Sequence, residues 1–148
     1  MGRAVTTYYM NEGAFELEGP RFTDHTTHVF AARHPEHGEV DVVIHRADFP
    51  PGKSLRDLLA AHLEVESKRL RNFAVFEVEP AEVQGLPALT VASRFREEGG
   101  QLVYQRQVHL ALGARWVYFA VVASMPARDA CDAWLAQVLG SLRLRGEA

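Results

Sequence analysis

The chain has 148 residues, of which 47% are apolar and 24% are charged, so its length and composition predict one globular domain over residues 1–148. The formal net charge of −3 provides no basic face, which excludes the usual electrostatic basis of nucleic-acid binding. No segment approaches the roughly 20 apolar residues of a membrane span, and residues 1–6 lead into no signal peptide, so we expect a cytoplasmic protein that does not insert into a membrane.

The N-terminal part of the chain is predicted to be extended. The segment Tyr9-Met10-Asn11-Glu12-Gly13-Ala14-Phe15-Glu16-Leu17 indicates two extended stretches joined by an Asn-Glu turn. Alternating side chains then predict a strand over residues 26–32, with Val29 and Phe30 on opposite faces. A second strand is predicted over residues 40–46, where both faces are partly apolar.

A helix is predicted over residues 54–70. Ser54 is a suitable N-cap, and Asp57 stands three residues later, in the position of a capping box. The apolar residues recur near helical spacing and form one stripe: Leu55, Leu58, Leu59, Leu63, Val65 and Leu70. A stripe of this kind marks the buried side of a helix.

Four further strands are predicted after Asn72, because turn residues separate alternating segments at 73–79, 88–96, 102–112 and 115–124. Tight turns between consecutive strands make antiparallel hairpins. A second helix is predicted near residues 127–139, with Pro126 in its first turn. Strands, helix, four strands and helix together predict the α+β class with an antiparallel β-sheet.

The second predicted helix also has an apolar side, formed by Ala130, Trp134, Leu135, Val138 and Leu142. Because Trp134 lies on this stripe, we expect it to be largely buried. The single cysteine, Cys131, excludes an internal disulfide. Its apolar surroundings favour a small buried side chain over a reactive thiol.

Among the seven histidines, the closest pairs are His25-x-x-His28 and His34-x-x-His37. Residues three apart in a strand point to opposite faces, and a zinc site needs about four converging ligands. No cysteine motif or HExxH sequence supplies the missing ligands. We therefore expect no bound metal.

The sequence also offers no catalytic motif. Glu64 and Glu66 are two residues apart on the predicted helix and so lie on different faces. The pair Gly99-Gly100 connects two strands instead of opening a helix, which argues against a phosphate-binding loop. We expect no catalytic residues, no cofactor and no enzymatic activity.

The strand over residues 102–112 has two different sides. One side is mainly apolar and suits a core: Leu102, Tyr104, Arg106, Val108, Leu110 and Leu112. The other is uncharged but polar and rich in amides: Val103, Gln105, Gln107, His109 and Ala111. This second side fits either an exposed sheet face or a semi-polar groove that grips another polypeptide.

The order of these segments resembles the DcrB-like family and, within it, the Eag (effector-associated) chaperones of bacterial type VI secretion. The resemblance is carried by the opening motif, Asp24-His25-Thr26-Thr27-His28-Val29-Phe30, the long helix, Val83-Gln84-Gly85-Leu86-Pro87-Ala88 and Gln105-Arg106-Gln107-Val108. It implies a PsbP-like sandwich, in which helices cover an antiparallel sheet. It also implies a homodimer.

The resemblance further implies a non-enzymatic chaperone-adaptor that binds the hydrophobic N-terminal transmembrane segments of a secreted effector. Such a chaperone shields these segments from water before the effector is loaded on the secretion spike. The family's client face carries over onto seven residues of this chain: Thr27, Val29, His62, Glu66, Leu70, Val103 and Gln107. We expect five of them to form one concave surface that is open to solvent when no client is bound: Thr27, Val29, Leu70, Val103 and Gln107.

Three of these positions depart from the family's preference. The family favours an apolar branched residue at Thr27, an amide at His62 and a small residue at Glu66. An unpaired carboxylate facing a transmembrane helix costs several kcal/mol. Glu66 is therefore expected either to rotate outward or to face a client of a different kind.

Two other functions remain open on the sequence. One is a non-catalytic DcrB-like module that binds a small amphipathic ligand or an envelope component. The other is an accessory domain whose interface is purely structural.

Overall fold

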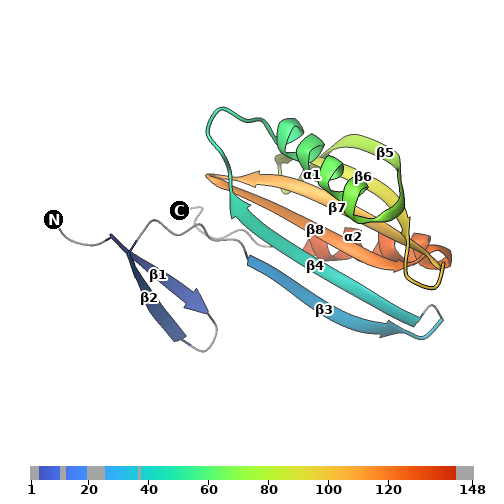
Figure 1. Ribbon diagram of the computed structural model, residues 1–148. Coiled ribbons are helices and arrows are strands. Elements are labelled where there is room, and N and C mark those ends of the chain that lie inside the picture. The colour runs from blue at the N-terminus through green and yellow to red at the C-terminus, as the bar shows by residue number, and fades with distance from the viewer. Residues whose placement is uncertain (1–3, 11–12, 20–25, 37, 143–148) are drawn as a thin grey trace.

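The computed structural model describes residues 4–10, 13–19, 26–36 and 38–142 (Figure 1). Its elements are β1 (Ala4–Met10), β2 (Gly13–Gly19), β3 (Thr26–His34), β4 (Gly38–Asp48), α1 (Leu55–Arg69), β5 (Arg71–Val83), β6 (Leu86–Arg96), β7 (Leu102–Leu112), β8 (Arg115–Ser124), a 3-10 turn (Met125–Ala127) and α2 (Arg128–Ser141). The α+β class and each predicted strand and helix are confirmed. β5 is longer at both ends than the sequence predicts.

The first two strands form a separate hairpin. β1 and β2 pair antiparallel, with Tyr8 opposite Phe15, which confirms the two extended stretches of the opening motif. Asn11 and Glu12, on which the predicted turn rests, lie outside the described residues. His25 and His37, each of which belongs to one of the histidine pairs, lie outside them too.

The other six strands form one antiparallel sheet in the order β3-β4-β8-β7-β6-β5. β5 to β8 make the predicted meander, and β8 then pairs with β4 (Figure 1). α1 connects β4 in one half of the sheet with β5 at the opposite edge. β3 and β5 are therefore the edge strands, and β7 and β8 lie in the middle.

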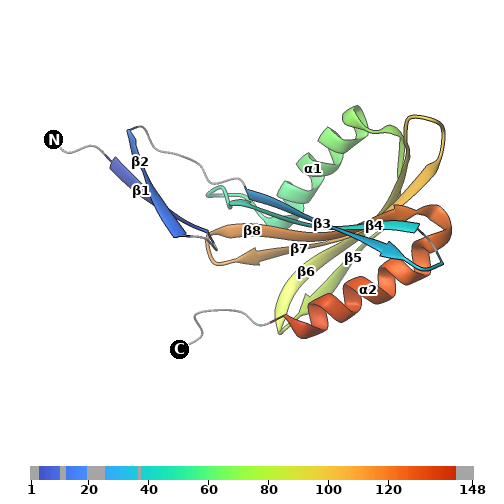
Figure 2. The ribbon, with the colours of Figure 1, turned by 90° about the horizontal axis from the view of Figure 1, so that it is seen from below.

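α1 covers one face of this sheet and α2 covers the other (Figure 2). The larger core lies under α2, and its most deeply buried side chains include Tyr104, Leu110, Val121, Cys131 and Leu135. A smaller core lies under α1, where Leu59 packs on Leu89 and Val91. The arrangement is the predicted sandwich, with an antiparallel sheet between two helices.

α1 begins with the predicted capping box. The Ser54 hydroxyl accepts a hydrogen bond from the Asp57 amide at 3.1 Å, and the Asp57 carboxylate accepts one from the Ser54 amide at 2.9 Å. The helix ends at Leu70, whose amide donates to the Glu66 carbonyl at 2.8 Å. Val65 is 60% exposed, so its assignment to the buried stripe was wrong.

The turn between β5 and β6 explains one of the motifs that carried the resemblance. Gln84 and Gly85 both have positive φ, at 50° and 80°, as a two-residue type I′ hairpin turn requires. The Gln84 side chain donates a hydrogen bond to the Leu139 carbonyl near the end of α2, at 3.2 Å. This turn therefore joins two strands and also satisfies a carbonyl in the last turn of α2.

α2 starts later than predicted, at Arg128, because Pro126 lies in the preceding 3-10 turn. Trp134 packs against the larger core as a partly buried side chain, as its place on the apolar stripe predicts. Cys131 and Leu135, one helical turn apart, point most directly at the sheet. Burial, aided by the nearby Asp132 carboxylate, raises the pKa of the Cys131 thiol to about 11, as expected for an unreactive core cysteine.

Replacing Leu135 should therefore test the α2 core. We expect Leu135→Ala to lower the free energy of unfolding by about 2–5 kcal/mol, because it opens a cavity between α2 and the sheet. The matched control is Val65→Ala on the exposed side of α1, which should change it by less than about 0.5 kcal/mol. Urea unfolding of the three proteins measures both values. Equal losses for the two variants would contradict the described packing.

Candidate functional site

A cavity of about 300 Å³ lies on the α1 face of the sheet, beside the last turn of α1. Its lining comes from α1, its C-cap residue and four strands: Val43, Glu66, Arg69, Leu70, Phe95, Gln105, Gln107, Tyr118, Ala120 and Val122. A second cavity, of about 280 Å³, also borders Val122 and continues toward the β6–β7 turn, where Glu39, Asp41, Glu97 and Val103 line it. We call the two together the sheet groove.

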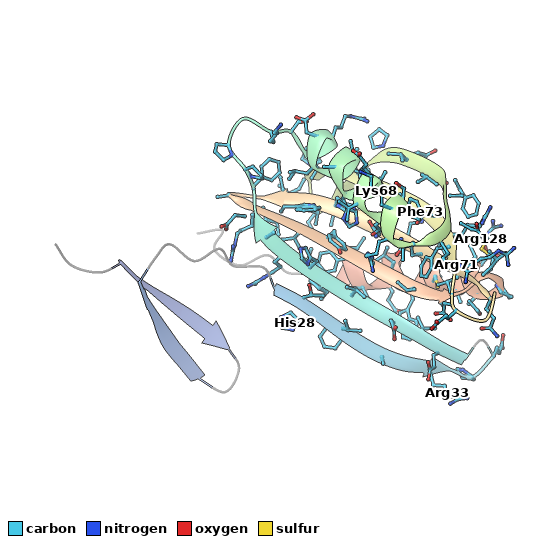
Figure 3. All side chains as sticks on the ribbon, in the orientation of Figure 1. His28, Arg33, Lys68, Arg71, Phe73 and Arg128 are labelled. Atoms are coloured by element: carbon cyan, nitrogen blue, oxygen red, sulfur yellow. The ribbon has the colours of Figure 1, made fainter. Side chains whose placement is uncertain are left out.

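The outer strand β3 extends the face of the sheet groove. Val29 pairs with Val43, which lines the groove, and Thr27 pairs with His45. Directly opposed residues of paired strands project to the same face, so Val29 and Thr27 lie on the groove side. Val29 is 59% exposed, whereas the Thr27 hydroxyl lies 2.7 Å from His45 Nδ1. His28 and Arg33 mark the two ends of this strand (Figure 3).

Glu66 is buried at the inner wall of the groove and is only 4% exposed. Its two carboxylate oxygens accept hydrogen bonds from the side-chain amides of Gln105, at 2.7 Å, and Gln107, at 3.1 Å. His62 Nε2 lies 2.7 Å from the same carboxylate as an ion-pair contact, although it does not meet hydrogen-bond geometry. Glu66 therefore points at the sheet, and outward rotation is excluded.

A chain of hydrogen bonds leads from Glu66 into the sheet. The side-chain oxygen of Gln107, Oε1, lies 2.7 Å from His109 Nε2, and Trp116 Nε1 donates to His109 Nδ1 at 3.0 Å. An indole N–H can only donate, so His109 must accept at Nδ1 and donate from Nε2 to Gln107. This requirement fixes both the histidine tautomer and the orientation of the Gln107 amide, whose nitrogen is left to face Glu66.

The electrostatics of this chain follow from its burial. Burial, followed by the nearby His62 ring, lowers the pKa of His109 from 6.5 to about 3, so His109 is neutral near pH 7. Burial alone would raise the pKa of Glu66, but the contact with His62 and the amides of Gln107 and Gln105 outweigh it and leave the pKa below its ordinary value. The result is a buried, ionised carboxylate with satisfied oxygens.

Five rings pack around the inner end of the chain, with centroids 4.8–5.9 Å apart among contacting pairs: His45, His62, His109, Trp116 and Tyr118. Reasoning from the sequence missed Trp116 and Tyr118. A signal was present, because the two aromatics alternate along β8 and face the amide-rich side of β7. The register between the two strands was needed to use it.

The structure brings most of the expected client residues together. Glu66, Leu70 and Gln107 line the first cavity, Val103 lines the second, and His62 contacts Glu66. Thr27 and Val29 lie on the same face, on β3, which β4 and β8 separate from β7.

The expected exposure of this surface was wrong for two of its five residues. Val103 is 5% exposed and Gln107 is 2% exposed. The amide-rich side of β7 is accordingly neither an exposed sheet face nor an open groove floor along its length. Val103, Gln105 and Gln107 border the sheet groove, whereas His109 and Ala111 are not among the residues that line it.

Two observations on the described residues concern metal binding and membrane spanning. No group of three or more His, Cys, Asp or Glu side chains converges there as a set of metal ligands. Neither α1 nor α2 is long and apolar enough to cross a membrane.

The buried His109 should give folding a defined pH dependence. The unfolded chain binds a proton at His109 near pH 6.5, whereas the folded protein resists protonation until about pH 3. The free energy of unfolding is therefore unaffected by protonation of His109 above pH 6.5. Below that pH it falls, because only the unfolded chain gains a proton, with a slope approaching about 1.4 kcal/mol per pH unit. Chemical unfolding between pH 7 and pH 5 should show a smaller loss for His109→Asn than for the wild type.

The exposed His28 supplies the control for this measurement. The variant His28→Asn should follow the wild-type profile. A His109→Asn protein that loses stability as steeply as the wild type would contradict the burial of a neutral His109.

The comparisons with known proteins agree with this architecture. The sequence profile of the DcrB family matches residues 12–141. Among solved structures, PA94 from Pseudomonas aeruginosa, a protein of unknown function, superposes with a TM-score of 0.78 at 19% identity, over 96% of this chain and 98% of that one. Cyanobacterial PsbP (CyanoP) from Synechocystis sp. PCC 6803 superposes with a TM-score of 0.55 at 12% identity, over 95% and 92%.

At these identities the two structures establish the fold alone, and the second confirms the PsbP-like architecture. No curated protein matches the sequence. Since the family profile covers most of the chain, from the opening motif to the end of α2, this protein belongs to the DcrB family.

Proposed function

We propose that this protein is a non-enzymatic chaperone-adaptor of type VI secretion, which binds the hydrophobic N-terminal transmembrane segments of an effector and shields them before loading on the spike. The observation that carries the proposal is the sheet groove, whose floor is lined by small and branched apolar side chains and is continued by the exposed Val29 of β3. Val43, Ala120 and Val122 form its floor, and Val29 continues this surface toward the edge of the sheet.

The chemistry of the groove suits a transmembrane helix as a ligand. Helices pack in membranes through small residues that allow close approach, with occasional polar side chains that hydrogen-bond across the contact. The groove offers the same combination, because Gln105 and Gln107 border its apolar floor. A helix lying there would exchange water for a surface like that of a partner helix.

The main objection to this proposal is a charged Glu66 beside an apolar client, and the two amide hydrogen bonds to Glu66, here called the Glu66 clamp, remove it. An ionised carboxylate beside an apolar helix is costly when its oxygens lack partners. Here the amides of Gln105 and Gln107 satisfy those oxygens before any client arrives. The cost of burying the charge is therefore met in folding and is not added to the free energy of client binding.

The proposal keeps the other expectations that the family resemblance implies. The chaperone acts in the cytoplasm, as a homodimer, without a cofactor and without inserting into the membrane. Its partner is the hydrophobic N-terminal region of a secreted effector.

A second candidate function rests on a different cavity. A pocket of about 450 Å³ lies between α2 and the strands β5 to β7, and its lining combines the apolar Val83, Val108 and Leu135 with the charged Arg106 and Asp132. An apolar interior with a few polar groups is typical of sites for small ligands. This pocket favours the alternative of a DcrB-like module that binds a small amphipathic molecule.

Charging the exposed strand β3 tests the chaperone proposal. We expect Val29→Asp to weaken binding of the client by roughly 100-fold or more, because it places an unpaired carboxylate in an apolar contact. Val29 is well exposed, so the variant should melt like the wild type. The assay is a pull-down of the hydrophobic N-terminal fragment of the effector encoded beside this gene, with a melting curve for each protein.

Phe30 provides a matched control, because it neighbours Val29 and is 57% exposed but points to the opposite face of β3. The variant Phe30→Asp should retain the client. If Val29→Asp binds like the wild type, or if both variants lose binding equally, the client does not lie on the α1 face.

A further inference from the structure

β5 is the edge strand opposite β3, and it carries an apolar surface that the proposed client site does not explain (Figure 1). Three of its large apolar side chains are well exposed: Val75 by 40%, Phe76 by 49% and Val78 by 41%. Within the described residues β5 pairs only with β6, so the backbone groups on its outer side have no strand partner. An apolar edge strand of this kind is a template for pairing with another chain.

Pro80 limits the part of β5 that could accept such a partner. Proline has no backbone N–H to donate, so regular pairing from the start of the strand reaches only Glu79. The strand begins at Arg71. Residues 71–79 are therefore the candidate edge, and Val75 is their middle residue.

Val75 is also the midpoint of this edge when position is measured along the neighbouring strand β6. The register places three residues at equal intervals: Arg71 opposite Arg96, Val75 opposite Ser93 and Glu79 opposite Thr90. The intervals are equal because β5 has one register shift on each side of Val75. Arg96 and Thr90 are an even number of residues apart on β6, so Arg71 and Glu79 project to the same face of the sheet.

The charged residues at the two ends of this edge lack counter-ions of their own. Among the described residues, no ion pair within 4.0 Å involves Arg71 or Glu79. Arg71 stands opposite another cation, Arg96 (Figure 3). The Glu77 carboxylate raises the pKa of Glu79, by a hydrogen bond and by its charge. Because like charges side by side are unfavourable, Arg71 favours an added carboxylate and Glu79 an added cation.

We propose that two copies of this chain pair antiparallel through their β5 edges, about a two-fold axis at Val75. In this arrangement Arg71 of each copy lies opposite the partner's Glu79, and the two Val75 residues lie opposite each other. A two-fold interface makes each contact twice, so one ion pair in the register becomes two.

The arrangement also fixes how the two sheets are combined. Antiparallel pairing of identical edge strands keeps the same face of both sheets on one side, so the two six-stranded sheets become continuous and both sheet grooves open in the same direction. The inference rests on the homodimer that the proposed function includes, and it specifies the interface. It does not depend on which client the groove binds.

A charge exchange tests the register. At about 50 mM salt, Arg71→Glu and Glu79→Arg should each raise the Kd of the dimer about tenfold, because each variant sets like charges opposite one another twice. The double variant Arg71→Glu, Glu79→Arg re-forms both ion pairs and should return the Kd to within about threefold of the wild type. Sedimentation equilibrium of the full chain measures these values. Both positions are exposed, so the melting curves should not change.

A substitution at the two-fold axis tests the apolar part of the interface. Val75→Lys sets two ammonium groups opposite each other and should raise the Kd of the dimer at least about tenfold. Val65→Lys is the matched control, because Val65 is an exposed valine of α1 outside the β5 edge. It should keep the wild-type Kd.

The outcomes separate this interface from the homodimer on which it rests. If Val75→Lys dimerises like the wild type, or if the double charge exchange dissociates as readily as the single variants, the β5 interface is overturned and the homodimer forms through another surface. If the wild-type chain is monomeric at every concentration up to about 100 times that of a micromolar complex, the homodimer itself is contradicted and the inference falls with it. Client binding is measured separately, by the pull-down with Val29→Asp.

Discussion

The carboxylate of Glu66 fixes the position of α1 on the sheet. It is held by two amides from β7, a central strand, so α1 covers β7 and β6 and leaves β4 and β3 uncovered on this face. A buried charge that loses a partner costs several kcal/mol, which makes this position of the helix hard to change. The sheet groove exists because α1 is held over one half of the sheet and ends beside the other.

The Glu66 clamp is the end of a hydrogen-bond chain that fixes the orientation of each polar side chain on this face. Trp116 sets the tautomer of His109, His109 sets the amide of Gln107, and Gln107 donates to Glu66. A network in which each member is satisfied is rigid, whereas a partly satisfied one is costly. The groove therefore has a preformed wall against which an apolar partner could pack without reorganising it.

Much of the fold could be predicted because its signals are local. The capping box at Ser54, the bounds of β7 and the turn at Gly85 each depend on a few adjacent residues. The inward position of Glu66, the burial of Gln107 and the ring cluster around His109 depend on how α1 lies over β7 and on which residues of β7 and β8 are opposed. Periodicity assigns a face to each residue, but it does not state what covers that face, so Val65 was placed on the buried stripe of α1 although it is 60% exposed.

Hydrogen–deuterium exchange of the full chain, with and without the hydrophobic N-terminal fragment of its effector, tests the central claim most directly. The claim is that the client lies in the sheet groove on the α1 face. It predicts slower exchange in β3, β4 and the last turn of α1, with α2 unchanged. Protection confined to α2 and β5 would contradict it, because that pattern would place the ligand in the pocket beneath α2.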